Sequence, residues 1–218
     1  MTNSEHANLM FYGNFVDADI NLEDLEDFLI DVSKFIDETK NRLSSKEFPS
    51  VPLHEVESLK DHYEYTFGEI LRKSFIVTLC IFLEQELGIY CKEFKKQLKL
   101  DISWKDFKGS VLERFKLYIN KLLKLKLNLS NTMWQDLQGI ISLRNCLVHS
   151  NGNLENFSDA ERIRAFSKRH NSLVINEDRV EISVKICQEC LGIIKDFIKT
   201  IYEYALSYFP GRYGRKIL

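Results

Sequence analysis

The sequence predicts an all-α helical bundle with one small β-hairpin before a long C-terminal helix. Only 3 prolines and 9 glycines interrupt 218 residues, which favours long helices over an architecture of many turns. Apolar residues recur at helical spacing through most of the chain, whereas residues 172–183 alternate as strands do. Apolar residues make up 44% of the chain and charged residues 28%, values that are typical of a folded protein.

The N-terminal region divides into an arm and an acidic helix. Residues 1–18 are expected to form a loosely ordered arm. From Asn21, a residue type suited to an N-cap, apolar residues recur every three or four positions, and acidic residues in the first turn suit the helix dipole. The segment 44–52 breaks this helix and forms a linker. We therefore expect residues 1–52 to be an arm and an acidic helix that pack on a helical domain of residues 53–218, within one structural unit.

The domain after the linker is expected to begin with a long helix from about Glu55 to Leu98. Its middle is apolar on nearly all sides, which is typical of a central buried helix. The segments 172–175 and 180–183 are expected to pair as a hairpin around a four-residue turn. Residues 210–218 are expected to be a frayed tail. Further helices are predicted at about residues 110–125, 132–149, 158–169 and 184–208.

Charge is polarised along the chain. Residues 1–60 carry 5 basic and 13 acidic side chains, a net of −8, and residues 92–126 carry 11 basic and 4 acidic side chains, a net of +7. Such polarity can steer a polyanion to one face. Solvated helix faces, or acidic and basic segments that pair inside an oligomer, remain alternative explanations.

Composition also bears on the cellular compartment. The N-terminus lacks the basic start and apolar stretch of a signal peptide. The longest apolar run, from Phe75 to Leu83, is about half of the roughly 20 residues that a membrane span requires. Five cysteines do not resemble a disulfide framework, and Cys187 and Cys190 lie in an apolar helical pattern that favours core packing. We expect a cytoplasmic protein with no membrane segment.

The helix predicted near residues 132–149 carries an unusual charge. Ser130 or Asn131 can cap its start, and residues 151–153, Asn-Gly-Asn, can end it. At about 100° per residue, Arg144 falls at the centre of the apolar stripe, where a charge is costly unless an anion or hydrogen-bonding group meets it. Asn145 and His149 are neighbours on one flank of the helix. The stripe consists of Met133, Leu137, Ile140, Ile141, Leu147 and Val148.

These three polar residues suit chemistry on a phosphodiester. Arg144 offers a permanent cation, Asn145 an orienting amide, and His149 a group that titrates near neutrality. Geometry alone leaves a structural explanation open. Arg144 could pair with a buried carboxylate such as Glu84 or Glu86, and His149 could be a helix-terminal residue that the dipole favours.

Residues 140–153 resemble the signature helix of the HEPN superfamily, in which Arg and a polar residue precede His, with four to six residues between Arg and His. Arg144, Asn145 and His149 match that pattern. The order of helices, a loop, a small hairpin and a long C-terminal helix is also similar to HEPN proteins of bacterial toxin–antitoxin and phage-defence systems. The resemblance covers residues 55–208 in architecture and about fourteen residues in detail.

The spacing of Arg and His by itself is not specific. With 10 Arg and 5 His in the chain, about 0.7 matches are expected by chance, and Arg164 to His170 is a second match. Requiring Asn, Asp or His directly after Arg retains Arg144 and rejects Arg164, which precedes Ala165. The retained match also closes an amphipathic helix.

The resemblance implies a metal-independent endoribonuclease that uses no cofactor and acts as a homodimer, with a composite active site where two motif helices meet. It implies that Arg144 binds and polarises the scissile phosphate, that His149 acts as general base or acid, and that Asn145 orients both. The RNA 2′-hydroxyl would attack its own phosphate, so DNA is not a substrate. An antitoxin or regulatory protein is a further expected partner of such a toxin or phage-defence effector.

One departure from the family pattern concerns the residue two positions after His149. HEPN toxins paired with nucleotidyltransferase antitoxins often carry there a Tyr that the partner modifies, and this chain has Asn151. An AMPylating antitoxin of that kind is therefore not expected. The alternative function is a non-catalytic HEPN-fold module that dimerises and binds RNA, nucleotide or a protein partner. The presence of Arg144, Asn145 and His149 together favours the enzyme.

Overall fold

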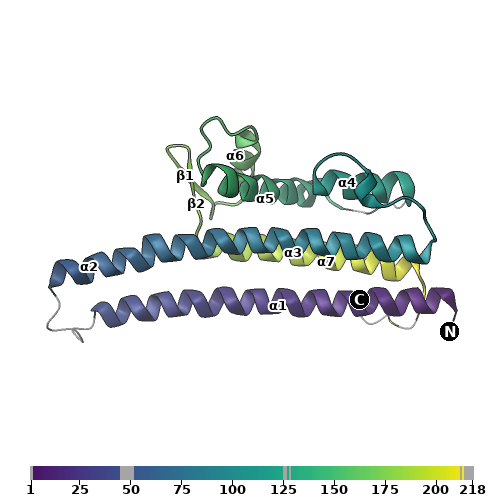
Figure 1. The fold of residues 1–218 in the computed structure, drawn as a ribbon, viewed down its shortest axis with the longest axis horizontal. Coiled ribbons are helices and arrows are strands. Elements are labelled where there is room, and N and C mark those ends of the chain that lie inside the picture. The colour runs from purple at the N-terminus through teal and green to yellow at the C-terminus, as the bar shows by residue number, and fades with distance from the viewer. Residues whose placement is uncertain (1, 45–51, 125–126, 128, 212, 214–218) are drawn as a thin grey trace. The chain divides into compact units, whose positions relative to one another are not determined.

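The structure, a computed structural model, describes residues 2–44, 52–124, 127, 129–211 and 213. The predicted all-α class is confirmed, as is the small hairpin before the long C-terminal helix (Figure 1). Most of the predicted linker 44–52 lies outside the described residues. The elements are α1 (Asn3–Ser44), α2 (Leu53–Asp61), α3 (Gly68–Gln97), α4 (Val111–Leu117), α5 (Asn131–Ser150), α6 (Ala160–Arg169), β1 (Val174–Asn176), β2 (Arg179–Glu181) and α7 (Val184–Tyr208), with π-helical turns at His62–Phe67 and Tyr118–Leu122 and a 3₁₀ turn at Trp104–Asp106.

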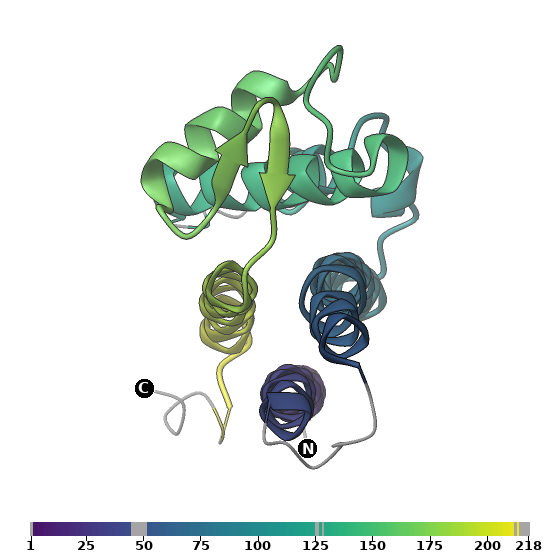
Figure 2. The ribbon, with the colours of Figure 1, turned by 90° about the vertical axis from the view of Figure 1, so that its left-hand side faces the viewer.

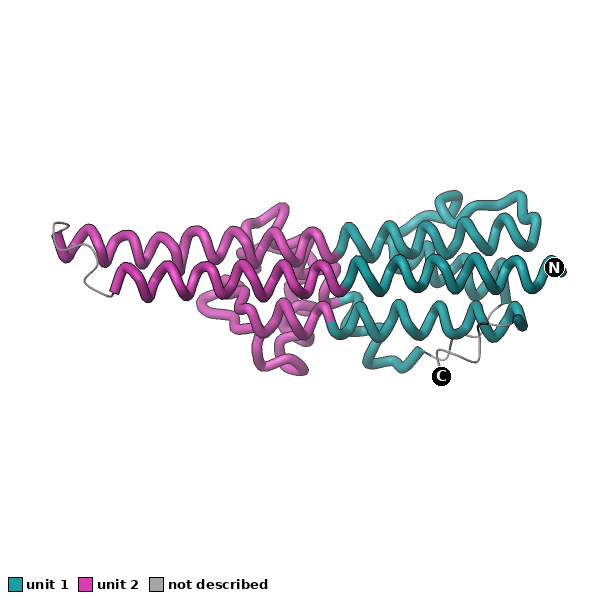
Figure 3. Tube along the Cα trace, turned by 90° about the horizontal axis from the view of Figure 1, so that it is seen from below, with its two compact units in different colours: residues 1–22, 80–138, 192–218 teal, residues 23–79, 139–191 magenta. Residues whose placement is uncertain are grey.

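The chain forms two compact units, each built from segments that are distant in the sequence (Figure 3). Helices α1, α3, α5 and α7 contribute residues to both units, so the boundaries between the units fall inside these helices. The division at residue 52 stays a prediction. Unit 1 contains residues 1–22, 80–138 and 192–218, and unit 2 contains residues 23–79 and 139–191.

The core of unit 1 is a cluster of aromatic rings around Phe11. The Phe11 ring stacks on Phe209 with centroids 5.5 Å apart and lies 4.8 Å from the ring of Phe94. Tyr90 and Tyr202 meet edge to face at 5.6 Å. Offset and edge-to-face contacts of this kind suit the aromatic quadrupole and bury large apolar areas. The rings therefore join α1, α3 and α7 within unit 1.

The expected loose arm at residues 1–18 is wrong, because α1 begins at Asn3 and continues without a break to Ser44. Ala7, Phe11 and Ala18 have no exposed surface and Leu22 has almost none. Two of these buried residues are alanines, which give little hydrophobic signal in a sequence. The aromatic cluster of unit 1 supplies the burial that stabilises the helix.

Asn8 connects the start of α1 to the end of the chain. It is fully buried, its Nδ2 donates to the carbonyl of Phe209 at 2.8 Å, and its Oδ1 accepts from the backbone N–H of Tyr213 at 3.1 Å. A Cβ at Gly211 would lie 2.6 Å from the Asn8 side chain. The described residues of the expected frayed tail, 210, 211 and 213, thus lie against α1, and the other residues of the tail are outside the described part.

In unit 2, α6 and the hairpin lie together on one side of α5 (Figure 2). A Cβ at Gly139 of α5 would lie 2.7 Å from Phe166 of α6, so the two helices approach as closely as glycine permits. Asp159, directly before α6, accepts a hydrogen bond from Ser142 at 3.1 Å. These contacts fix which side of α5 is covered within unit 2.

The hairpin has a two-residue turn, and the predicted four-residue turn is wrong. Asn176 pairs with Arg179, which leaves only Glu177 and Asp178 between the strands. Their φ angles of 44° and 64° are the left-handed values that a two-residue turn of type I′ requires. The Asp178 carbonyl accepts from the N–H of Leu154 at 2.7 Å. Asp tolerates this backbone well, whereas Glu177 does not, and the bond from Leu154 in a neighbouring loop helps to hold the turn.

The long helix predicted from about Glu55 to Leu98 is present as one helical run, Leu53–Gln97. By length and composition, an 18-residue segment of this run could cross a membrane, but 56% of that segment is buried inside the structure. Phe75, Ile76 and Leu79 are at most 2% exposed. A core helix satisfies the same criteria of length and composition, so the run carries no further conclusion about a membrane.

All five cysteines of the chain are buried and free of disulfides. Burial raises the pKa of the Cys187 thiol to about 12, and burial is also the main reason that the pKa of Cys146 is raised. Since the thiolate is the reactive form, these residues act as small core side chains, in agreement with the packing role predicted for Cys187 and Cys190.

Candidate functional site on helix α5

Helix α5 has defined ends on both sides. Ser130 accepts a hydrogen bond from the N–H of Met133 at 3.0 Å, so it is the predicted N-terminal cap. After Ser150 the chain adopts left-handed φ angles of 49° at Asn151 and 86° at Gly152, and the Gly152 N–H donates to the carbonyl of Cys146 at 3.2 Å. This is the glycine-dependent helix ending that the sequence predicts. It places His149 in the last turn.

The buried side of α5 differs from the predicted stripe. Leu143 and Cys146, which were not part of the stripe, are fully buried, whereas Val148 is 48% exposed. Arg144 therefore lies at the edge of the buried side rather than at its centre, and it is half-buried. The reason is that α6 and the loop before it cover the side of α5 that bears Cys146, whose Sγ donates to the Asn153 carbonyl at 3.4 Å.

The Arg144 guanidinium contacts its own neighbour in the sequence. Its Nη1 donates to Oδ1 of Asn145 at 3.0 Å, and Arg144 forms no ion pair with any residue that the structure describes. Of the two carboxylates considered as partners, Glu86 accepts from the Tyr202 hydroxyl at 3.1 Å and Glu84 pairs with another arginine. The positive charge of Arg144 is thus not neutralised within the described residues.

His149 lies one helical turn after Asn145 and forms no hydrogen bond with this pair. The residue is exposed, and it makes no hydrogen bond or ion pair within the described part of the chain. Asn145 is one helical turn earlier, so both residues lie on the same side of α5. The structure joins Arg144 to Asn145 and leaves the imidazole of His149 open to an incoming group.

Lys73 of α3 lies beside the end of the motif, a position that the sequence does not predict. Its Nζ donates to Oδ1 of Asn151 at 2.9 Å and to the Asn151 carbonyl at 3.3 Å. It also pairs with Glu69 at 2.5 Å, and this hydrogen bond is the main reason that the pKa of Glu69 is lowered. Lys73 and Asn151 are 78 residues apart in the chain. No local pattern could have connected them.

The same contacts account for the residue two positions after His149. Asn151 combines a left-handed backbone with a side-chain acceptor for Lys73. Asn tolerates this backbone better than most residues. Asn151 therefore has a structural role in ending α5.

The second match to the Arg–His spacing is in a different environment. Arg164 of α6 pairs with Asp178 in the turn of the hairpin, and His170 lies 3.3 Å from a carboxylate oxygen of Glu189. Both residues of this match thus have acidic partners, unlike Arg144.

Comparison of the chain with known protein families, with curated proteins and with solved structures found no match. What α5 offers chemically is an unneutralised guanidinium held by an amide, with an exposed imidazole one turn along the same helix. Such a set suits a substrate that is anionic and undergoes proton transfer.

Proposed function

We propose that the protein is a metal-independent endoribonuclease of HEPN type, a cytoplasmic toxin or phage-defence effector that cleaves RNA. The observation that carries the proposal is the half-buried guanidinium of Arg144, which is held by Asn145 and paired with no carboxylate among the described residues. In that position the cation can bind an incoming anion without first breaking an ion pair among the described residues. A phosphate of RNA supplies that anion, and a forked guanidinium can bind it with two hydrogen bonds.

The proposed reaction needs one proton acceptor and one proton donor. The RNA 2′-oxygen forms a bond to phosphorus while the bond from phosphorus to the 5′-oxygen breaks, leaving a 2′,3′-cyclic phosphate. A general base takes the proton of the 2′-hydroxyl and a general acid gives a proton to the departing 5′-oxygen. His149 supplies one of these groups. A second His149 from another copy of the chain supplies the other, which is the chemical reason for a homodimer with a composite site.

The exposed side of α5 is suited to such pairing. Val148 is 48% exposed and lies between Arg144 and His149 along the helix, and Ile141 is only half-buried. Apolar side chains beside an unneutralised charge are more favourably placed when a second helix covers them and an anion meets the charge. Two copies of α5 that meet here would bring both imidazoles to one phosphate.

The decisive experiment compares the wild-type protein with His149→Ala and Arg144→Ala on total RNA in the presence of a metal chelator. We expect wild-type cleavage with cyclic phosphate ends and a loss of about 10²-fold or more in each variant. His62→Ala, which changes an exposed histidine away from α5, should retain full activity. Equal cleavage by wild type and His149→Ala, or no cleavage by either, would falsify the enzyme proposal.

A second candidate function is a non-catalytic HEPN-fold module that dimerises and binds RNA, nucleotide or a protein partner. It is favoured by the absence of a hydrogen bond between His149 and the described Arg144–Asn145 pair. RNA binding by the wild-type protein that Arg144→Ala weakens, without cleavage under any condition, would support this candidate over the enzyme.

A further inference from the structure

Helix α1 exposes a regular apolar stripe within unit 2. Phe28 and Phe35 are 48% and 53% exposed, and Leu25 and Val32 are half-buried. The four residues follow one another at intervals of three, four and three positions, which is the spacing of a coiled-coil seam. A different set of residues on the same helix, with Leu29 at its centre, faces the core. The stripe is therefore an exposed apolar surface that lies next to the buried side of α1.

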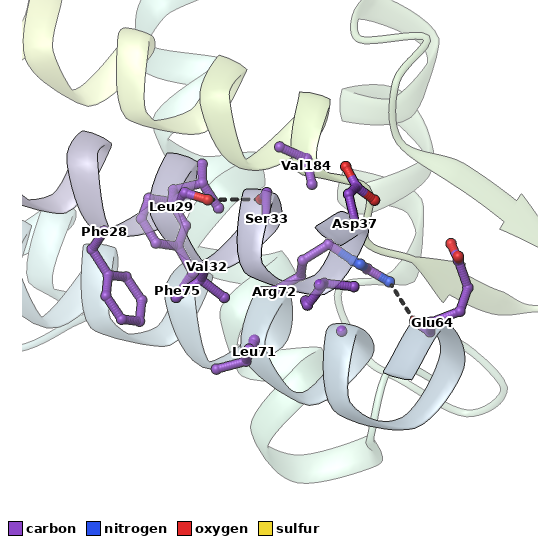
Figure 4. A pocket seen from close by; sticks show the side chains of 12 residues that line it. Phe28, Leu29, Val32, Ser33, Asp37, Glu64, Leu71, Arg72, Phe75 and Val184 are labelled. Carbon is purple, nitrogen blue, oxygen red and sulfur yellow. Dashed lines mark hydrogen bonds between the residues drawn. The ribbon is translucent and has the colours of Figure 1, made fainter. Parts of the chain in front are cut away.

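A cavity of about 120 Å³ opens beside the stripe (Figure 4). Phe28 and Val32 of α1 line it together with Leu71 and Phe75 of α3, all in unit 2. Val184 of α7 also contributes. An apolar cavity of about 150 Å³ accommodates a benzene molecule, so this cavity is close to the size of one apolar side chain.

The charge around the stripe is strongly acidic. Residues 23–38 contain seven acidic side chains and one basic side chain, a net of −6. Asp24 lies one turn before Phe28, and Asp31 lies one turn before Phe35. Both aspartates are exposed, and neither forms an ion pair with a described residue. Each exposed phenyl ring thus has an unneutralised carboxylate next to it.

We propose that this stripe binds an amphipathic α-helix of another protein, with apolar residues at the same three–four spacing and Lys or Arg along the flank that meets the acidic side of α1. The apolar residues pack against Phe28, Val32 and Phe35, and one of them enters the cavity. The basic flank meets Asp24 and Asp31, which lie on the same side of the stripe. A second copy of this chain is disfavoured as occupant through the same stripe, because two segments of net −6 would repel each other.

The proposal does not depend on the nuclease activity, and synthetic helices test it. The first probe is a labelled peptide of roughly three heptads with Leu at the two seam positions and Lys on the flanks. The second has Glu in place of Lys, and the third has the composition of the first in scrambled order. Fluorescence anisotropy with the full-length protein should show saturable binding of the first peptide, at least about tenfold tighter than the other two.

Variants of the protein locate the binding site. Phe28→Ser combined with Phe35→Ser should weaken binding of the first peptide by about tenfold or more, because the stripe is lost. Asp24→Lys combined with Asp31→Lys should weaken it as well, and this pair leaves the apolar surface intact. The matched control is Ile30→Ser, since Ile30 is 47% exposed on the same helix but lies outside the stripe. Circular dichroism of each variant checks that α1 is still folded.

Several outcomes would overturn the proposal. Equal binding of all three peptides would show that neither the seam nor the charge is recognised. Unchanged binding by the two double variants, or no binding of the first peptide, would exclude the stripe as the site. A wild-type dimer that Phe28→Ser and Phe35→Ser dissociate, measured by solution mass, would show that a second copy covers this surface instead.

Discussion

The guanidinium of Arg144 donates a hydrogen bond to the side-chain oxygen of Asn145, its neighbour in the sequence, at 3.0 Å. Successive residues of a helix point about 100° apart, so this bond turns the long arginine side chain across the surface of α5. The charge is held at the border between the buried and exposed sides. A hydrogen bond between adjacent residues at this border adds little to the free energy of unfolding. Arg144 thus differs from Leu143 and Cys146, which stabilise the fold by being buried.

Arg144→Ala should therefore have little effect on stability. It removes no ion pair among the described residues, so we expect the free energy of unfolding to change by less than about 0.5 kcal/mol. Leu143→Ala is the matched control, because Leu143 has no exposed surface and its truncation should cost about 2–5 kcal/mol. Urea denaturation of both variants measures the difference. A large loss of stability with Arg144→Ala would indicate a structural role.

Gly139→Ala tests the close approach of α5 and α6. The added Cβ would lie 2.7 Å from three atoms of Phe166, one of which is the Cβ of Phe166. Because a Cβ cannot move without its backbone, α5 and α6 must shift apart. We expect a loss of about 1–3 kcal/mol. Gly192→Ala in α7 is the control, since a Cβ there meets no atom within 4 Å, and it should stabilise the protein by about 0.5–1 kcal/mol. Thermal unfolding should rank the two variants on opposite sides of the wild type.

The carboxyl group of Glu86 makes stability depend on pH. Burial is the main cause that raises its pKa above the ordinary 4.5, while the hydrogen bond from Tyr202 acts in the opposite direction. Because the pKa of Glu86 is higher in the folded state than in the unfolded state, the protonated carboxyl group contributes to the free energy of unfolding. This contribution is complete below pH 4.5 and is lost as the pH rises through the raised pKa. Glu86→Gln should therefore gain stability relative to wild type between pH 4 and pH 7. A constant difference across that range would contradict the assignment.

Tyr202→Phe provides a companion to that measurement. Without the hydroxyl, the buried Glu86 carboxylate loses its 3.1 Å hydrogen bond. The expected cost near pH 7 is about 1–3 kcal/mol. The cost should shrink at pH 4, where protonation removes the buried charge. Equal destabilisation at both values would mean that the ring, rather than the hydrogen bond, dominates.

Asn8→Ala tests the connection between the two ends of the chain. The change removes the donor to the Phe209 carbonyl and the acceptor for the Tyr213 N–H, which should cost about 1–3 kcal/mol. Backbone amides near residues 206–213 should exchange hydrogen faster. Ser4→Ala, whose exposed hydroxyl bonds to Pro210, should change stability by less than about 0.5 kcal/mol. Unchanged exchange in Asn8→Ala would show that the end of the chain is held by other contacts.

Local sequence patterns predicted the regular elements well where the signals were themselves local. Ser130 caps α5, and Asn151 with Gly152 ends it, as expected from their backbone preferences. The start of α1 was missed because Ala7 and Asn8 are buried by residues nearly 200 positions away, such as Leu206. A helix stabilised mainly by distant contacts leaves only a weak trace in its own sequence.

The candidate site shows a similar limit. A helical wheel placed Asn145 and His149 together on one flank of the helix, but it placed Arg144 at the centre of the buried side. The wheel weighted Val148 as a core residue because it is apolar, whereas packing of α6 selects Leu143 and Cys146 instead. Which side of a helix is covered depends on the neighbouring elements. Lys73, which bonds to Asn151, could not be found from the sequence for the same reason.

The burial of every cysteine has a practical consequence for spectroscopy. All five thiols are buried, and burial raises the pKa of Cys91 and Cys187. We therefore expect the natural cysteines of the folded protein to react slowly with maleimide reagents. A single introduced thiol, such as Ile30→Cys on the exposed side of α1 outside the apolar stripe, would then carry a spin label or fluorophore with no need to remove the natural cysteines. The signal of such a probe would report whether the proposed partner helix binds to α1, in a protein that carries one substitution.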